Sequence, residues 1–333
     1  MAKSKAAPVA LDYAPPEEPE LRSQLEHHFR RLSRRHHNLL GIGVGPRIRG
    51  GEPEPEIAIR LIVASKPRVR GKLPAGEPRL PEFLPIWTSV LGRKLCLMIP
   101  TDISQQISVR KVSFGVDGGQ ATALATWGDA QGLQQFGVIT AAHCLPEVGQ
   151  TVKVSTRSGV IRAPVIARSD VSRDGFDIGL ARLDCPVEDI ANAAHGSAPS
   201  ITIPELVNVL GTGRDDQLQA PMRFWNDADP GELIGLCYYW LYAARSGGQP
   251  LVMRDAVEVV AEPGTFVKGL SGSPLAIELK GDETKIACLA GYASQDGHLC
   301  IGTLFRAGIA WLRSSRTELA GLHTFWAMQE LGR

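Results

Sequence analysis

A succession of short apolar or alternating runs between residues 112 and 312 constrains the fold of this 333-residue chain more than any other feature. Runs of six to ten residues bounded by Gly, Asp, Asn and Pro are typical of strands, and ten of them in about 200 residues predict a barrel or sandwich. The 35 glycines and 23 prolines are spread along the chain, which favours many turns between short strands. The runs are ATALATW, FGVITAAH, TVKVST, APVIAR, DIGLARL, ITIPELVNVL, LVMRDAVEVV, SPLAIEL, KIACLAGYA and LCIGTLF.

The first 110 residues have a different pattern. Residues 1–18 lack periodicity and are predicted to be a disordered tail. Apolar residues then recur at spacings of four, four and three from Leu21 to Leu32, which predicts an amphipathic helix. The following segment alternates with period two on both sides of a Gly/Pro/Glu-rich turn and predicts a β-hairpin. Residues 19–110 are therefore expected to form a helix-plus-hairpin unit with a regulatory or interaction role.

The end of the chain carries helical spacing. Ile309 to Leu312 and residues 317–330 predict two helices, so residues 111–314 form the expected strand-rich domain and 315–333 a C-terminal helix. The longest apolar run, Leu233 to Ala244, has 12 residues and predicts a buried strand or short helix, because a membrane span needs 18 or more. No signal-peptide core occurs in the first sixteen residues, so a cytoplasmic location without membrane contact is expected.

Charge and motif patterns argue against several ligands. The 36 Lys and Arg balance 35 Asp and Glu, and the basic end of the N-terminal helix is interpreted as a solvated cationic end, so nucleic acid is not an expected partner. His28 and His36 lie about 12 Å apart on a helix, too far for one metal ion. Gly41 to Gly45 lacks the spacing of a dinucleotide fingerprint. Six cysteines without a CxxC pair predict mostly free, buried thiols, and neither a metal nor a cofactor is expected.

Three separated segments carry the residue types that nucleophilic acyl transfer requires. They are TAAHC around His143, FDIGL around Asp177 and GLSGSP around Ser271. A serine hydroxyl is a poor nucleophile at neutral pH, so it needs an imidazole to take its proton and a carboxylate to hold that imidazole in the right tautomer. The backbone N–H groups of Gly269 and Ser271 could converge on an oxyanion, since the glycines around the serine allow a sharp turn.

These motifs resemble those of the trypsin-like serine peptidases, in which TAAHC, D-[IV]-x-L and G-x-S-G-x-P occur in the same order. The resemblance covers about residues 112–314 and implies a mainly β, chymotrypsin-like double β-barrel, here preceded by a small α/β unit and followed by a helical C-terminus. It implies a serine endopeptidase with His143 as base, Asp177 as its orienting carboxylate, Ser271 as nucleophile, and the Gly269 and Ser271 amides as oxyanion hole. The N-terminal segment is similar to an extension found before intracellular bacterial members.

The chain departs from that family at positions linked to activation and specificity. Leu270 stands where secreted members have an Asp that pairs with a newly cut N-terminus, so this activation is not expected. Thr265 occupies the position at the base of the family's primary specificity pocket, which gives no indication of cleavage after Lys or Arg. Ser294 is expected to line the pocket wall as a second substrate-binding residue. Cys144 has no cysteine in the preceding strand region to pair with.

Alternatives remain at two of the site positions and for the function. Asp174 and Asp184 compete with Asp177 but are more typical of turn or capping residues, and the G-x-S-G register favours Ser271 over Ser273. The expected partners are a protein or peptide substrate and a regulatory protein that binds the N-terminal unit. A catalytically silent interaction module and a partner-activated protease of a signalling or defence system are the competing functions.

Overall fold

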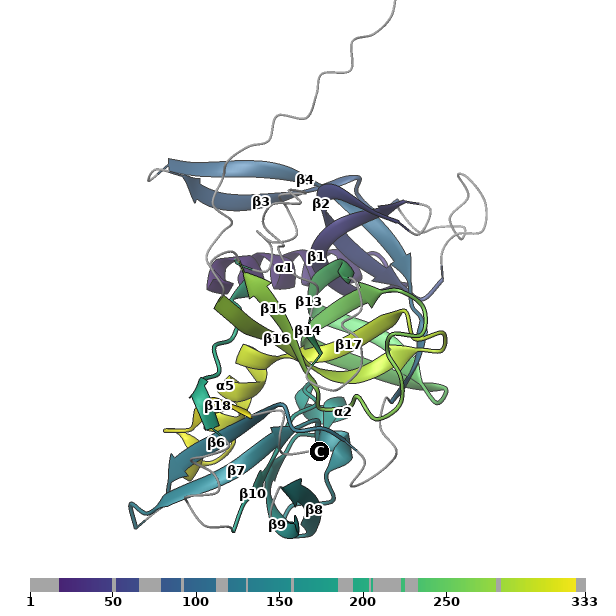
Figure 1. Cartoon of the computed structure of the whole chain (residues 1–333). Helices are drawn as coiled ribbons and strands as arrows, with labels where there is room; N and C mark the ends of the chain where they lie inside the picture. The colour runs from purple at the N-terminus through teal and green to yellow at the C-terminus, as the bar shows by residue number, and fades with distance from the viewer. Residues whose placement is uncertain are drawn as a thin grey trace, which may run out of the picture.

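The computed structural model describes residues 18–49, 52–65, 79–90, 93–111, 119–129, 131–156, 159–184, 194–203, 205, 223–224, 233–279 and 283–327. The described residues form two sheets and a few helices, which confirms the mainly β prediction (Figure 1). Residues 1–17 of the predicted tail, Cys185 and most of the ITIPELVNVL run lie outside these residues, whereas Glu18, the last residue of that tail, begins a helix. No helix among them has the length and apolar character needed to cross a membrane.

The larger sheet has eleven strands. They are β1 (Leu39–Arg49), β2 (Glu52–Val63), β3 (Phe83–Val90), β4 (Arg93–Gln105), β5 (Ser108–Lys111), β12 (Arg223–Phe224), β13 (Leu233–Ser246), β14 (Gln249–Ala261), β15 (Pro274–Leu279), β16 (Glu283–Ser294) and β17 (Leu299–Leu304). Their order is β12-β15-β16-β17-β14-β13-β1-β2-β4-β3, and β5 pairs with both β13 and β16. Because of this double pairing, β5, β13, β14, β17 and β16 form a closed ring of strands.

The smaller sheet has seven strands in the order β11-β18-β6-β7-β10-β9-β8. They are β6 (Ala123–Gly128), β7 (Gln134–Thr140), β8 (Thr151–Thr156), β9 (Gly159–Arg168), β10 (Gly179–Arg182), β11 (Ala194–Ser197) and β18 (His323–Ala327). The helices are α1 (Glu18–Ser33), α2 (Val171–Asp174) and α5 (Phe305–Ser315), with short 3-10 turns η1 (Ala142–Cys144) and η2 (Thr317–Leu319). A buried cluster that includes Ile286 and Leu289 of β16, Ile139 of β7 and Phe305 of α5 joins the two sheets.

The predicted N-terminal helix and hairpin are confirmed as α1, β1 and β2, but they share a sheet with the strands that follow residue 110. Strand β1 lies between β13 and β2, antiparallel to both. A Cβ atom at Gly43 would lie 2.5 Å from the Tyr239 ring, so the glycine allows β1 to approach β13 closely. Leu21 and Leu25 of α1 are buried in the same core cluster as Val257 of β14. The glycine-rich segment is thus a packing feature of this sheet.

Helix α1 also covers the free edge of the larger sheet. The Gln24 side chain donates to the carbonyl oxygen of Trp87 (2.8 Å) and accepts from its N–H (2.6 Å), and His28 Nε2 donates to the Pro85 carbonyl (2.7 Å). These contacts satisfy backbone groups of β3 that would otherwise be open to another strand. Figure 1 shows α1 below the β3–β4 ribbon and above strands β13 to β17.

The prediction for the end of the chain is half right. Helix α5 exists, but residues 317–327 form the η2 turn and strand β18 in place of a second helix. Leu319 and Leu322 are buried in the cluster between the sheets, as their helical spacing implied, but Gly321 lies between them. The His323–Ala327 segment pairs with β6 and β11, so sheet hydrogen bonds outweigh the local helical pattern.

Candidate active site

His143 lies in η1, directly after strand β7. Its side chain is buried and has only 4% exposed surface. Arg168, at the end of β9, donates from Nε to the carbonyl oxygens of Ala142 and Leu145, both at 3.1 Å. The same guanidinium forms an ion pair with Glu147 (2.9 Å). The turn that carries the imidazole is therefore fixed from outside by one charged side chain.

Asp177 lies between α2 and strand β10 and is fully buried. Its backbone N–H donates to the Thr303 hydroxyl of β17 (2.8 Å). The Ser169 hydroxyl accepts from the N–H of Ile178 (2.9 Å) and lies 2.7 Å from the carbonyl oxygen of Phe176. The backbone on both sides of Asp177 is thus held in place, with contacts from strands of both sheets.

Ser271 lies in the turn between β14 and β15, and its side chain has no exposed surface. Gly269 and Gly272 have φ angles of 98° and 82°, which other residues rarely adopt, so the turn depends on both glycines. The Ser271 carbonyl accepts from the N–H of Gln120, just before β6 (2.7 Å), and the N–H of Gly272 donates to Ala290 of β16 (2.8 Å). Contacts to both sheets fix this turn.

The three side chains form one hydrogen-bonded chain. His143 Nδ1–H donates to Asp177 Oδ2 (2.6 Å), and Nε2 lies 2.7 Å from the Ser271 hydroxyl, which can donate to it. The second carboxylate oxygen, Oδ1, accepts from the backbone N–H of His143 (3.1 Å). A Cβ atom at Gly291 would lie 2.9 Å from the carboxylate, so this glycine leaves the space that Asp177 occupies. The tautomer with the proton on Nδ1 is the one that leaves Nε2 free to accept.

The surroundings shift the pKa values of the acid and the base. Burial lowers the pKa of His143, but the Asp177 carboxylate beside it has the larger combined effect, and the pKa is raised above its ordinary 6.5. Burial raises the pKa of Asp177, and the charge and hydrogen bonds of His143 reverse this, so the net pKa is lowered. The Tyr292 ring lies 5.4 Å from the imidazole between ring centroids and helps to exclude water from it.

Two backbone donors are available beside the hydroxyl. Within the described part of the chain, neither the N–H of Gly269 nor that of Ser271 donates a hydrogen bond. Ser271 is buried, where a donor without an acceptor is uncommon unless it serves a ligand, whereas Gly269 is half-buried. The two predicted oxyanion donors therefore remain free to bind one.

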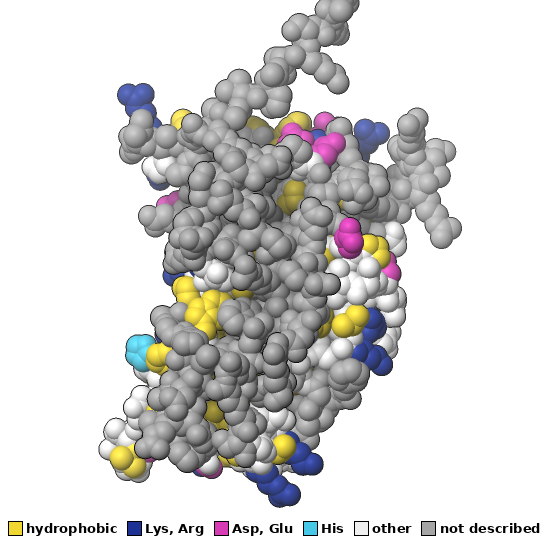
Figure 2. Space-filling view, viewed as in Figure 1, with side chains coloured by type: hydrophobic (Ala, Val, Ile, Leu, Met, Phe, Trp, Pro, Cys, Tyr) yellow, Lys and Arg dark blue, Asp and Glu magenta, His cyan; other side chains and the backbone are white. Residues whose placement is uncertain are grey.

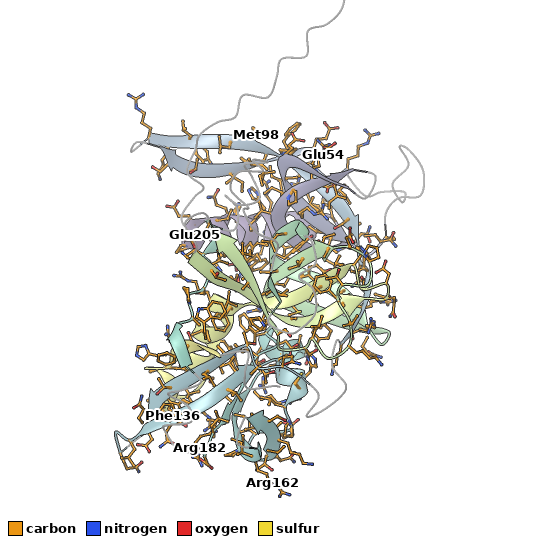
Figure 3. All side chains as sticks on the ribbon, viewed as in Figure 1. Glu54, Met98, Phe136, Arg162, Arg182 and Glu205 are labelled. Atoms are coloured by element: carbon orange, nitrogen blue, oxygen red, sulfur yellow. The ribbon has the colours of Figure 1, made fainter. Side chains whose placement is uncertain are left out.

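The rival residues lie in other environments. Ser273 is fully buried, and its hydroxyl has no partner among the described residues. Asp174 is bound to Arg173 and accepts from the N–H of Asp170. Asp184 pairs with Arg182, which Figure 3 places toward the outer end of the smaller sheet. None of the three carries a hydrogen bond to the His143 ring within the described residues.

The two predicted substrate-binding residues lie on loops that contact each other. Thr265 is half-buried in the β14–β15 connection, and Ser294 begins the β16–β17 turn. Backbone hydrogen bonds join these loops, from Gly264 N–H to Asp296 and from Phe266 N–H to the carbonyl of Gly297, each 2.8 Å. The Ser294 hydroxyl donates to the Asp296 carboxylate (2.6 Å). The structure therefore brings the two loops together, with the serine hydroxyl engaged inside its own turn.

Four residues that support the His143 and Asp177 segments were not predicted from the sequence. Arg168 and Ser169 are consecutive at the end of β9, yet one braces the His143 turn and the other the Asp177 segment. Thr303 and Gly291 belong to strands of the other sheet. Nothing in the local sequence marks these four, because their partners are distant along the chain.

The cysteines and basic groups bear on other expectations. Every described cysteine is a free thiol, buried in all cases except Cys96, which confirms the cysteine prediction for this part of the chain.

In α1, Arg30 forms an ion pair with Glu26, so part of the basic end is neutralised. On the face drawn in Figure 2, Lys and Arg side chains lie in separate places and do not gather in one patch.

Comparisons with known proteins give no further assignment. No protein-family model matches the chain, and no curated protein matches it. The geometry of the site therefore carries the functional argument.

Proposed function

We propose that the chain is a serine endopeptidase of trypsin-like architecture. The observation that carries the proposal is the hydrogen-bonded chain from Asp177 through His143 to Ser271, which three distant segments of two sheets assemble. The free N–H groups of Gly269 and Ser271 support it, because they supply the donors that acyl transfer needs. The two-sheet arrangement, with a closed ring of strands in the larger sheet, also fits a double β-barrel.

In the proposed reaction the Ser271 oxygen attacks the carbonyl carbon of the scissile peptide bond while its proton passes to Nε2 of His143. The carbonyl oxygen becomes an oxyanion, which the N–H groups of Gly269 and Ser271 would bind. The imidazolium, stabilised by Asp177, gives its proton to the leaving amine as the C–N bond breaks and an acyl-enzyme remains. Water that loses a proton to the same imidazole then releases the acid product and restores the hydroxyl.

A fluorophosphonate probe tests this proposal. Intact-mass measurement of the full chain should show one adduct on the wild type and on Ser273→Ala, and none on Ser271→Ala or His143→Ala. The Ser273→Ala variant is the matched control, since it removes a buried hydroxyl two residues away. An adduct that persists in Ser271→Ala would contradict the assignment of the nucleophile.

One observation favours an activated form of the same function. The Ser271 side chain has no exposed surface, so a bulky reagent needs the site to open. Labelling by diisopropyl fluorophosphate, together with a peptidyl phosphonate that reacts only slowly, would support a closed resting site that a partner opens. Equal rates for the two reagents would argue for a site that is open at rest. No adduct with either reagent on a folded wild type would favour the silent interaction module.

A further inference from the structure

An ion pair connects helix α1 to strand β14. Arg22 Nε donates to Asp255 Oδ1 (2.8 Å), and Nη2 forms the second contact with Oδ2. The Tyr238 hydroxyl donates to Oδ1 as well (2.6 Å). The Asp255 side chain is 10% exposed, so its charge depends on these two partners for compensation.

Asp255 has an unusual backbone conformation. Its φ is 45°, and among the described residues it is the only non-glycine residue with a positive φ. A non-glycine residue in this region is strained and persists only where its surroundings hold it. The contacts to Arg22 and Tyr238 are the interactions that hold this side chain.

The strained residue lies where β14, which pairs with β13 on both sides of it, gains a second partner on its other edge. From Ala256 onward, β14 pairs with β17, beginning with Thr303. Immediately before Asp255, the N–H of Arg254 donates to the carbonyl oxygen of Gly175 (2.8 Å). The left-handed conformation at Asp255 therefore directs one residue toward β17 and its neighbour toward the segment that leads to Asp177.

Both of these contacts reach the Asp177 backbone. Gly175 is two residues before Asp177, and its φ of 80° and the lack of a Cβ let it lie against the Arg254 side chain. On the other side, Thr303 accepts from the N–H of Asp177 itself (2.8 Å). The residues before and after Asp255 thus support two of the contacts that position the orienting carboxylate, and Ser169 supplies the others to its backbone.

We propose that Arg22 is a positioning residue for the triad: by holding Asp255 in its left-handed conformation, it fixes two of the anchors of the Asp177 segment, the contacts to Gly175 and Thr303. Docking of α1 then controls the activity of the site. The proposal rests on the proposed peptidase function where labelling by the probe is measured. It does not rest on that function where the pKa of His143 is measured.

The experiment compares Arg22→Ala with Gln24→Ala in the full chain. Both variants remove two hydrogen bonds from α1, but Gln24 contacts β3 and has no link to β14. We expect Arg22→Ala to slow fluorophosphonate labelling by about 10- to 100-fold, as misplacement of a catalytic group does. The Gln24→Ala variant should label at the wild-type rate even if its melting temperature falls equally, and Arg22→Lys should recover part of the loss.

NMR titration of the His143 ring supplies the readout that does not need catalysis. A displaced carboxylate stabilises the imidazolium less, so the pKa of His143 should fall in Arg22→Ala and stay unchanged in Gln24→Ala. Equal pKa values in both variants and the wild type would overturn the proposal. If the wild type does not react with the probe at all, this titration still decides the question, so failure of the proposed function remains distinguishable.

The Asp255→Gly variant tests whether Arg22 acts through Asp255. Glycine adopts a φ of 45° without an ion pair, so Asp255→Gly should keep most of the labelling rate. In that background, Arg22→Ala should have little further effect. If Arg22→Ala lowers the rate by the same factor with and without Asp255→Gly, the two residues act independently and the route through Asp255 is wrong.

Discussion

Replacing Asp177 by asparagine would keep the shape of the side chain but change which hydrogen bonds its two terminal atoms can accept or donate. The carboxylate accepts from the backbone N–H of His143 (3.1 Å) and from its ring Nδ1–H (2.6 Å). An asparagine has one accepting oxygen and one donating NH2 group. The backbone N–H cannot give up its proton, whereas the ring can, so the oxygen takes the backbone donor and the NH2 group faces an unprotonated Nδ1.

This arrangement puts the imidazole proton on Nε2, the atom that in the proposed reaction accepts the proton of Ser271. The imidazole then cannot act as base. Since Asp177 is only 1% exposed, water cannot easily replace the lost acceptor. In the Ser-His-Asp template the same substitution lowers kcat by about 10⁴-fold. That factor corresponds to about 5 kcal/mol in the activation barrier.

The assay is the second-order rate constant for fluorophosphonate labelling of the wild type, Asp177→Asn and the matched control Asp174→Asn. The control changes an aspartate three residues away that binds Arg173. Its effect should be much smaller than that of Asp177→Asn, because Asp174 binds Arg173 and the Asp170 N–H and carries no hydrogen bond to His143 among the described residues. Thermal unfolding checks that both variants fold. A wild-type rate in Asp177→Asn, or a larger loss in Asp174→Asn, would refute the reasoning about the tautomer.

Three further predictions concern the same region. The folded-state pKa of His143 lies above the unfolded value of about 6.5, so its stabilising contribution is complete below about pH 6.5 and is lost as pH rises through the folded pKa. In urea unfolding, the difference in the free energy of unfolding between wild type and His143→Ala should shrink as the pH rises from about 6.5 through the folded-state pKa. The Gly272→Ala substitution should lower the free energy of unfolding by more than about 3 kcal/mol, because its Cβ would collide with the Gln120 carbonyl. At Gly132, where φ is 78° and nothing lies within 4 Å, alanine should cost only about 1–2 kcal/mol. Ser273→Ala should leave the free energy of unfolding unchanged or raise it by up to about 2 kcal/mol, since the hydroxyl is buried without a partner among the described residues.

Local patterns predicted the elements whose structure depends on local sequence. Period-two runs bounded by turn residues became strands, since alternation fits a sheet with one buried face wherever its partner comes from. Spacing of three and four predicted α1 because its apolar stripe had a core to cover. The segments around His143, Asp177 and Ser271 could be identified because nucleophilic chemistry needs those three groups in restricted settings.

Such local patterns could not predict which distant strands would pair. Nothing near Gly43 indicates that β1 inserts beside β13, about 200 residues later in the chain, although its glycines are explained once that neighbour is known. The segment after α5 had helical spacing, but strand pairing with β6 decided its structure. In both cases the partner strand supplied hydrogen bonds and buried area that no window of local sequence contains.

The same dependence on distant partners explains why the site is built between the sheets. Asp177 precedes a strand of the smaller sheet, yet its N–H binds Thr303 of the larger one. Ser271 belongs to the larger sheet, yet its carbonyl accepts from Gln120, which precedes β6 of the smaller one. Each sheet thus holds the reactive segment of the other. A shift between the sheets would lengthen the 2.7 Å contact between His143 and Ser271 without breaking a pairing between the strands of either sheet, so the geometry of the site depends on how the two sheets pack.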